Sequence, residues 1–244
     1  MTVLAACHVH SNLSYDGTYP LEALSDKFSR AGYRVVLMTE HDRGFSPERL
    51  CQLRELCDAA STSDLLMIPG IEYSDASNQV HILVWGDVPF LGENLPTGET
   101  LRRVKEAGGL AVLAHPFRRN AWQRFEPNWG EALTGIEVWN RKYDGWSPNP
   151  IAKDLQRSVG AIPFVGLDFH TQKQFFPLAM ALDFDSTVTE QAVLDCIRAR
   201  RVNPRVLGFQ VEGELVRHAL PILGAAEASR KKAARAFRKM KSRV

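Results

Sequence analysis

Histidines recur along the whole sequence beside short apolar runs. Six of the seven share this setting: His8, His10, His41, His81, His115 and His170. A single histidine in a strand is usually a structural residue, but imidazole nitrogens are also common ligands of divalent metals. Because so many lie next to carboxylates, turns or one another, we expect them to converge on one metal site.

The strongest local signal is the His-x-His pair formed by His8 and His10. Side chains two apart in a strand point to the same side, so both imidazoles are expected to face one cation. Asp168 and His170 repeat this spacing with a carboxylate and an imidazole, a mixture that suits zinc, manganese or iron better than magnesium. We expect Glu72 to end a strand in a similar position, where its two oxygens could bridge two cations.

Asp16 lies in a turn sequence, where an aspartate is ordinary on its own. With the residues above it completes nine candidate ligands: His8, His10, Asp16, His41, Glu72, His81, His115, Asp168 and His170. A single tetrahedral zinc takes only four ligands. The sequence therefore predicts a site for two or three divalent ions, with manganese, zinc or iron as the candidates.

Short apolar runs alternate with helical patterns and would position these ligands. We expect strands at 3–10, 35–38, 65–68, 80–85, 110–114, 135–139, 162–167 and 178–184, and helices at 20–32, from Ser46, and at 97–108, 151–159 and 189–200. This order predicts an α/β protein with a parallel sheet, most economically a closed or nearly closed β/α barrel. In such barrels the chemistry takes place at the carboxyl ends of the strands, where most of the candidate ligands fall.

The composition is that of one soluble domain. The chain has 244 residues, 45% apolar and 24% charged, which is enough for a single core, and we expect the barrel to span residues 1–224. Its four cysteines form no CxxC pattern, which argues against a zinc ribbon or a disulfide scaffold. We find neither a signal peptide nor an apolar run long enough for a transmembrane segment, so we expect a cytoplasmic protein.

The charge is uneven along the chain. Residues 227–244 contain eight Lys or Arg and one acidic residue, a net charge of +7, so the other 226 residues carry −5 of the overall +2. We expect residues 225–244 to form a basic amphipathic helical tail. Such a tail either contacts an anionic partner, which would be nucleic acid or a membrane surface, or packs a narrow stripe on the barrel.

In order, these motifs resemble those of the PHP (polymerase and histidinol phosphatase) family of metal-dependent phosphoesterases, over about residues 4–185. The matching segments are His8-Val-His10, Ser14-Tyr-Asp16-Gly17, Thr39-Glu-His41-Asp42, Gly70-Ile-Glu72, His81, Ala114-His115-Pro-Phe-Arg118 and Gly166-Leu-Asp168-Phe-His170. The segment Gly135–Asn140 further resembles the small stand-alone members. The chain departs from the family at Glu40 and Leu167, where members often have Asp and Ser.

This resemblance implies a distorted (β/α)7 TIM-like barrel with a trinuclear site. It implies that one metal takes His8, His10, Glu72 and Asp168, that a second shares Glu72 and adds His81 and His115, and that a third takes Asp16, His41 and His170.

Such a site predicts a phosphoric ester hydrolase. Two cations that share a water lower its pKa and hold the resulting hydroxide for in-line attack on phosphorus, so we expect hydrolysis of a small phosphate ester, such as a phosphorylated metabolite or nucleotide. Arg118 is expected to clamp a phosphate oxygen, and Asn140 to orient substrate or water. The acid for the leaving group is either Asp42 or metal-bound water.

Three alternatives stay open. Only 33 residues separate His81 from His115, which leaves little room for a cap domain, so a larger substrate is possible. The chain would then be a PHP-type protein-tyrosine phosphatase or an exonuclease-like phosphodiesterase. A metal-dependent amidohydrolase also uses His-x-His on its first strand, but usually with a bridging lysine. The third alternative is a binding module with structural metals.

Overall fold

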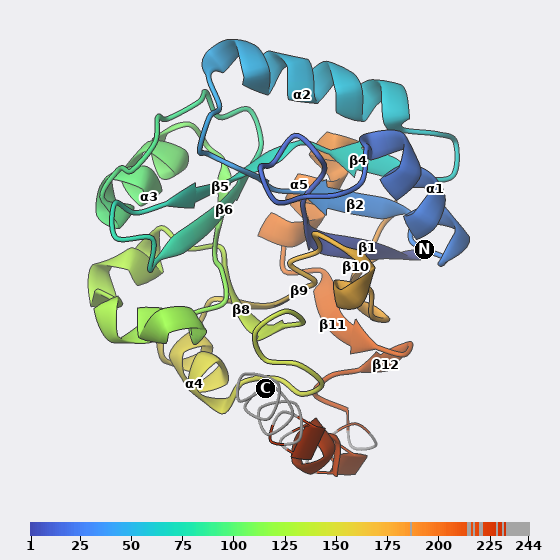
Figure 1. The fold of residues 1–244 in the computed structure, drawn as a ribbon, viewed down its shortest axis with the longest axis vertical. Helices are drawn as coiled ribbons and strands as arrows, with labels where there is room; N and C mark the ends of the chain where they lie inside the picture. The colour runs from blue at the N-terminus through green and yellow to red at the C-terminus, as the bar shows by residue number, and fades with distance from the viewer. Residues whose placement is uncertain are drawn as a thin grey trace, which may run out of the picture.

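A computed structural model gives the chain a mixed α/β fold in which helices surround two six-stranded sheets (Figure 1). It describes residues 1–185 and 187–213 and, towards the C-terminus, residues 216, 218, 219, 222–227, 229, 230 and 232. Among these residues, no helix combines the length and the apolar character needed to span a bilayer.

The first sheet has the order β12-β11-β10-β1-β2-β4. Its strands are β1 (Thr2–Val9), β2 (Val35–Met38), β4 (Leu66–Ile68), β10 (Leu178–Asp183), β11 (Val202–Val206) and β12 (Phe209–Gln210). Strands β1, β2 and β4 are parallel, and β10 pairs antiparallel with β1. Strand β2 is the run Val-Val-Leu-Met and is wholly buried, as expected for a parallel strand covered on both faces.

The second sheet has the order β3-β5-β6-β7-β8-β9. Its strands are β3 (Glu40–His41), β5 (Gly70–Ser74), β6 (His81–Trp85), β7 (Leu110–Leu113), β8 (Gly135–Asn140) and β9 (Ile162–Gly166). Strand β6 runs antiparallel to both of its neighbours. The prediction of a parallel sheet was therefore wrong for β6 and β10. For β6 the reason is the six-residue connection from Ser74, which is too short for a parallel crossover.

The two sheets adjoin on both sides of the candidate site. Strand β2 is followed after one residue, Thr39, by β3, and β4 is followed after Pro69 by β5. On the other side, the segment after β9 bonds to β1: Phe169 donates its N–H to the His8 carbonyl at 3.0 Å and accepts that of His10 at 2.9 Å. The strand ends of both sheets are thereby gathered around one region.

The helices lie outside the sheets, with α1 and α2 along one edge and α3 and α4 along another (Figure 1). They are α1 (Leu21–Arg30), α2 (Pro47–Ala60), α3 (Thr97–Glu106), α4 (Pro150–Val159) and α5 (Glu190–Arg198), with 3-10 helices at Arg118–Arg124, Pro127–Glu131 and Gln172–Gln174. The predicted start of α2 is confirmed, because the Ser46 side chain accepts the Arg49 N–H and Pro47 follows it.

The predicted basic tail, residues 225–244, lies mostly outside the described residues. Within its described part, Glu227 is buried and accepts two hydrogen bonds from Arg230, each at 2.7 Å. The tail's anionic partner stays a prediction.

Candidate metal centre

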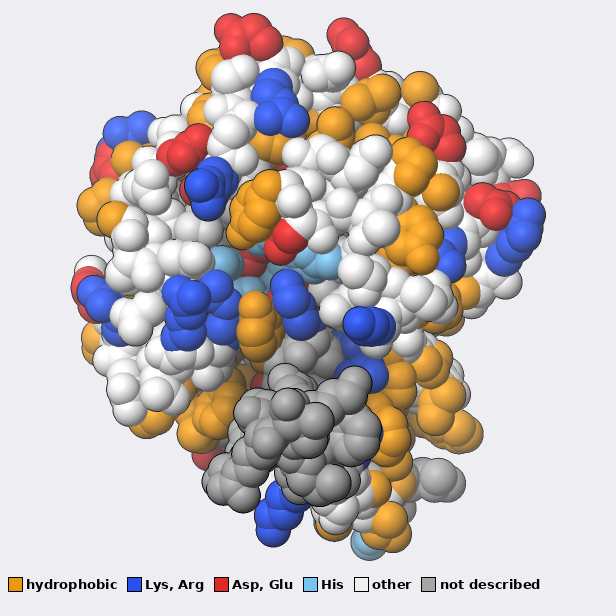
Figure 2. Space-filling model, viewed as in Figure 1, with side chains coloured by type: hydrophobic (Ala, Val, Ile, Leu, Met, Phe, Trp, Pro, Cys, Tyr) orange, Lys and Arg blue, Asp and Glu red, His pale blue; other side chains and the backbone are white. Residues whose placement is uncertain are grey.

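The nine candidate ligands lie in one cluster where the strand ends of the two sheets meet. Eight of them are buried, and only Asp16, at 37% side-chain exposure, is substantially open to solvent. Figure 2 shows histidine atoms in a hollow of one face, with Lys and Arg side chains along one side. The nine predicted side chains therefore lie together, although they come from segments up to 162 positions apart.

Glu72 lies at the centre of the cluster. Its Oε1 is 2.6 Å from His81 Nδ1 and 3.0 Å from His115 Nε2, and its Oε2 is 3.1 Å from His41 Nδ1. Burial alone would raise the pKa of Glu72, but the surrounding histidines, His81 and His8 foremost, lower it well below its ordinary value. The prediction that Glu72 ends a strand was wrong, because it lies in the middle of β5.

His8 and His10 face the cluster together, although not through regular strand alternation. The pairing register of β1 shifts between Cys7 and Val9, and His8 has a φ of 63°, so a bulge turns its side chain. The Nε2 atoms of His8 and His10 lie 3.5 and 3.4 Å from Glu72. Both are 3.8 Å from Asp168 Oδ1.

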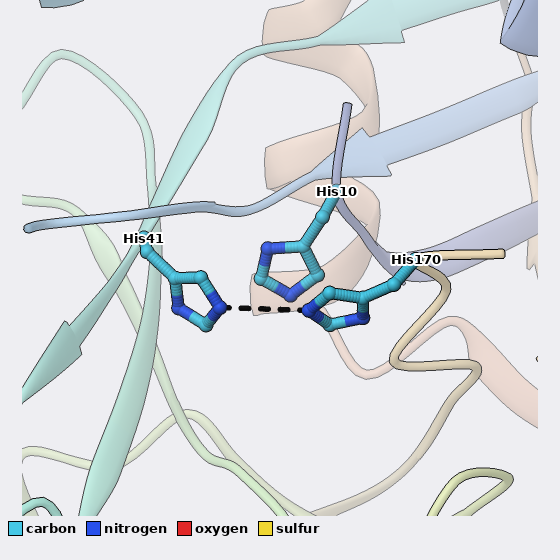
Figure 3. A group of neighbouring side chains, drawn as sticks. All are labelled: His10, His41 and His170. Carbon is cyan, nitrogen blue, oxygen red and sulfur yellow. Dashed lines mark hydrogen bonds between the residues drawn. The ribbon is translucent and has the colours of Figure 1, made fainter. Parts of the chain in front are cut away.

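A second group of imidazoles lies on the outer side of the cluster. His10, His41 and His170 point toward one another, and the Nε2 atoms of His41 and His170 are 3.5 Å apart (Figure 3). Asp16 reaches both from its turn, with Oδ1 3.2 Å from His41 Nε2 and Oδ2 3.2 Å from His170 Nε2. This places a carboxylate and three imidazoles around one point.

His81 reaches the cluster from the amino end of its strand. The prediction that the ligands sit at carboxyl ends of strands was wrong here, because β6 is antiparallel to β5 and pairs His81 with Ser74, the last residue of β5. Asp168 and His170 follow the last residue of β9, as the predicted strand at 162–167 requires.

The chemistry of the donor set fits divalent cations. Within the described part of the chain, three buried imidazole nitrogens of the cluster have no hydrogen-bond partner: His8 Nε2, His10 Nε2 and His115 Nδ1. Three buried triads each bring ligand atoms within 4.8 Å of one another: His10, His41 and His170; His8, Glu72 and His115; and His8, His10 and Asp168. Unpartnered buried polar atoms are costly unless a ligand satisfies them, so the clusters suggest divalent metal binding.

Three of the candidate ligands also have a strained backbone conformation. His8, His115 and Asp168 have φ values of 63°, 26° and 47°, in the left-handed region that residues with a side chain rarely adopt. Each such residue costs about 1–3 kcal/mol and persists only where its surroundings hold it. Three of the nine candidate ligands are therefore held in a backbone conformation that their surroundings must stabilise.

Glu137, which is buried in β8, was not predicted from the sequence as a site residue. Its Oε1 accepts a hydrogen bond from His8 Nδ1 at 2.8 Å, and its Oε2 accepts from His115 N at 2.7 Å and Asn140 Nδ2 at 2.8 Å. A signal was present, since a carboxylate inside an apolar strand must have buried partners.

Glu40 and Ser14 support the outer group of imidazoles. The buried Glu40 carboxylate accepts the Ser11 N–H at 2.9 Å and the Ser14 hydroxyl at 2.5 Å. The same hydroxyl oxygen accepts the His41 N–H at 3.0 Å and lies 3.4 Å from His10 Nδ1. The departure from the family at Glu40 therefore falls on a residue that holds the ligand loop in place.

Lys142 was also missed. Its Nζ lies 3.2 Å from Asp168 Oδ1 and 3.4 Å from His170 Nδ1. Burial would raise the pKa of Asp168, but the charges of His8 and Lys142 lower it to about 2. Lys142 follows β8 in a loop, and nothing in its sequence setting distinguishes it from a solvated lysine.

Arg118 and Asn140 lie at the cluster but already have protein partners. The Arg118 guanidinium is 3.1 Å from His81 Nε2 and donates to the Tyr143 hydroxyl and to Asn78. Asn140 is fully buried, and its Oδ1 accepts the N–H groups of Lys142 and Tyr143. Their contacts with substrate stay predictions.

Asp42 lines a cavity of about 300 Å³ beside the cluster, together with Tyr15, His41, Arg43, Ser74 and Glu93 among others. Asp42 Oδ2 accepts the Ser74 N–H at 3.1 Å, and burial raises the pKa of Asp42 to about 6. The Tyr15 ring stacks on His41 with centroids 4.9 Å apart. The cavity thus offers carboxylates and an aromatic wall next to the candidate ligands.

Neither a family model nor a curated protein matches this sequence. Solved structures do share its fold. A two-domain protein from Bacteroides vulgatus, described as containing a predicted PHP-like metal-dependent phosphoesterase, has 19% identity and a TM-score of 0.65; the match covers 84% of this chain and 65% of that protein. PsfC from Pseudomonas syringae has 19% identity and a TM-score of 0.63, over 96% of this chain and 99% of PsfC.

A third structure, an amidohydrolase from Chromobacterium violaceum with bound sulfate and no metal, has 15% identity and a TM-score of 0.49, over 68% of this chain and 87% of that protein. The first two likenesses show that this chain shares its mixed α/β fold with these two proteins. At 19% identity they establish the fold alone. This chain spans less than two thirds of the Bacteroides protein, 65% of its length.

Proposed function

We propose that this chain is a PHP-type metal-dependent phosphoesterase that hydrolyses a small phosphate ester. Its architecture would be a distorted (β/α)7 barrel over residues 1–224, with the metal site among the strand ends. The observation that carries the proposal is the cluster of nine ligand-type side chains around Glu72, eight of them buried, with imidazole nitrogens that have no hydrogen-bond partner in the described residues.

The residues would hold up to three divalent ions, manganese, zinc or iron. The proposed sets are His8, His10, Glu72 and Asp168; Glu72, His81 and His115; and Asp16, His41 and His170. The two buried oxygens of Glu72 support its place as the shared ligand, since Oε1 faces His81 and His115 while Oε2 faces His41 and His10. Among the residues that the structure describes, no lysine takes this central position, which favours the phosphoesterase over an amidohydrolase.

Divalent cations held by these residues supply Lewis-acid polarisation and make a water molecule nucleophilic near neutral pH. The protein itself provides positive charge for the phosphate: Lys142 lies beside Asp168, and Arg118 lies over His81. A guanidinium binds phosphate oxygens in pairs, and a lysine ammonium binds as a point charge. We assign the phosphate group of the substrate to the side of the cluster where Lys142 and Arg118 lie.

Asp42 lies in the wall of the cavity that also contains Ser74, Asn78 and Glu93. We assign this cavity to the organic part of the ester and Asp42 to proton donation to the leaving oxygen. Its proximity to His41 and its place in the cavity wall support the assignment.

The test is phosphate release from a panel of phosphorylated metabolites, nucleotides, bis-aryl phosphodiesters and short oligonucleotides, with Mn²⁺, Zn²⁺ or Fe²⁺. We expect His8→Ala and Asp168→Ala to abolish turnover. His218→Ala is the matched control, since this exposed histidine lies outside the cluster. Equal activity in the two cluster variants and the wild type, or cleavage of amides without phosphate release, would overturn the proposal.

A further inference from the structure

Glu137 joins three elements around one carboxylate. It extends from β8, its Oε1 accepts from His8 of β1, and its Oε2 accepts both the backbone N–H of His115 and the side-chain amide of Asn140. The carboxylate is 1% exposed, and the His8 ring is fully buried. No water competes for these bonds, so their geometry fixes the groups they join.

The fourth element, β9, makes room for this carboxylate. Gly166 ends β9, and a Cβ at this position would lie 1.7 Å from Glu137 Oε1 and 3.1 Å from His8 Cβ. Only a residue without a side chain fits there. Gly166 of β9 therefore leaves the space in which the Glu137 carboxylate of β8 contacts His8.

We propose that Glu137 is a positioning residue that sets the tautomer of His8. A carboxylate only accepts hydrogen bonds, so Glu137 holds the proton of a neutral His8 on Nδ1. The lone pair is then on Nε2, the atom that faces Glu72 and Asp168 at 3.5 and 3.8 Å and has no hydrogen-bond partner in the described residues. The inference rests on the metal site of the proposed function.

The isosteric variant Glu137→Gln is expected to reverse the tautomer of His8. Two donors, His115 N and Asn140 Nδ2, meet at Oε2, so the amide oxygen of a glutamine goes there. Its NH₂ group then faces His8 Nδ1 and donates to it. The proton of neutral His8 is displaced to Nε2, which removes the lone pair that a cation needs.

The experiment compares zinc binding by wild type, Glu137→Gln and the control Glu131→Gln, which changes an exposed glutamate of the Pro127–Glu131 helix. Competition with a chelator is expected to show about 10- to 100-fold weaker zinc binding by Glu137→Gln and no change in the control. Long-range proton–nitrogen spectra of the zinc-loaded wild type are expected to show the His8 proton on Nδ1.

Unchanged zinc affinity in a folded Glu137→Gln variant would overturn the inference. A proton on Nε2 of His8 in the zinc-loaded wild type would overturn it without any variant. Zinc binding that weakens as expected in a protein that hydrolyses no phosphate ester would refute the proposed function and leave this inference standing. A wild type that binds no zinc would overturn the inference, and one that binds neither zinc, manganese nor iron would refute the proposed function as well.

Discussion

The substitution Gly166→Ala tests most directly how closely the residues around His8 are packed in the candidate metal centre. The new methyl group would lie 1.7 Å from Glu137 Oε1, about half of an ordinary van der Waals separation. Because Gly166 lies in β9 and pairs with Asn140 of β8, its backbone has little freedom to retreat. The carboxylate must move instead, and its hydrogen bonds must break.

The loss of folding stability follows from overpacking and from the buried donors that would lose Glu137 as their acceptor. Overpacking alone costs about 1–3 kcal/mol, and each buried donor left without an acceptor costs about 1–3 kcal/mol more. His8 Nδ1, His115 N and Asn140 Nδ2 all lose Glu137 if it is expelled. We expect the free energy of unfolding to fall by at least about 3 kcal/mol.

Urea denaturation monitored by circular dichroism measures this change, and chelator competition measures zinc affinity in parallel. Gly98→Ala is the matched control: a Cβ there meets nothing closer than 3.7 Å, in the first turn of α3. It should be neutral or raise stability by up to about 1 kcal/mol. If Gly166→Ala is as stable as the wild type and binds zinc equally well, Glu137 does not occupy the confined position described here.

Other perturbations address separate parts of the site. Burial raises the pKa of Asp144 to about 6, so the folded protein binds this proton more tightly than the unfolded chain does. The free energy of unfolding therefore falls as pH rises from 4 to 6. In urea titrations, Asp144→Asn should remove about 2 kcal/mol of this fall. Ser14→Ala leaves Glu40 and the His41 N–H short of a partner and should cost about 1–3 kcal/mol by the same assay. Lys142→Met should raise KM for a phosphate ester roughly tenfold, with little change in zinc affinity. Free zinc at about 100 times its Kd should stabilise the wild type by about 2.7 kcal/mol in thermal melts, and chelator should reverse this.

The fold was predictable from sequence where local rules decide the structure. The apolar run Val35–Met38 is a strand as predicted, and the Ser46-Pro47 cap begins a helix where expected. Strand direction was not predictable in the same way. Alternation and apolarity say which residues are buried, but they carry no information on which strand lies beside which, and β6 was placed in the wrong direction for that reason.

Some residues of the candidate site were predictable from the sequence, and others were not. His8 and His10 were predictable from their residue type and their spacing. The nine predicted side chains lie together in the structure. Glu137 and Lys142 act through neighbours that are distant in sequence: Glu137 is 129 positions from His8, and Lys142 is 26 from Asp168. Such partners emerge only when the strands are placed side by side.

His8, His115 and Asp168 have positive φ angles, so keeping these candidate ligands lowers the stability of the fold. Glycine or asparagine adopts this backbone conformation at less cost, so replacing these residues by either would relieve strain at the very positions that supply ligands. His10 and His170, which have no such strain, offer no comparable relief. A lineage that no longer needed the site would therefore gain stability by losing it, and these three positions would be the first to change.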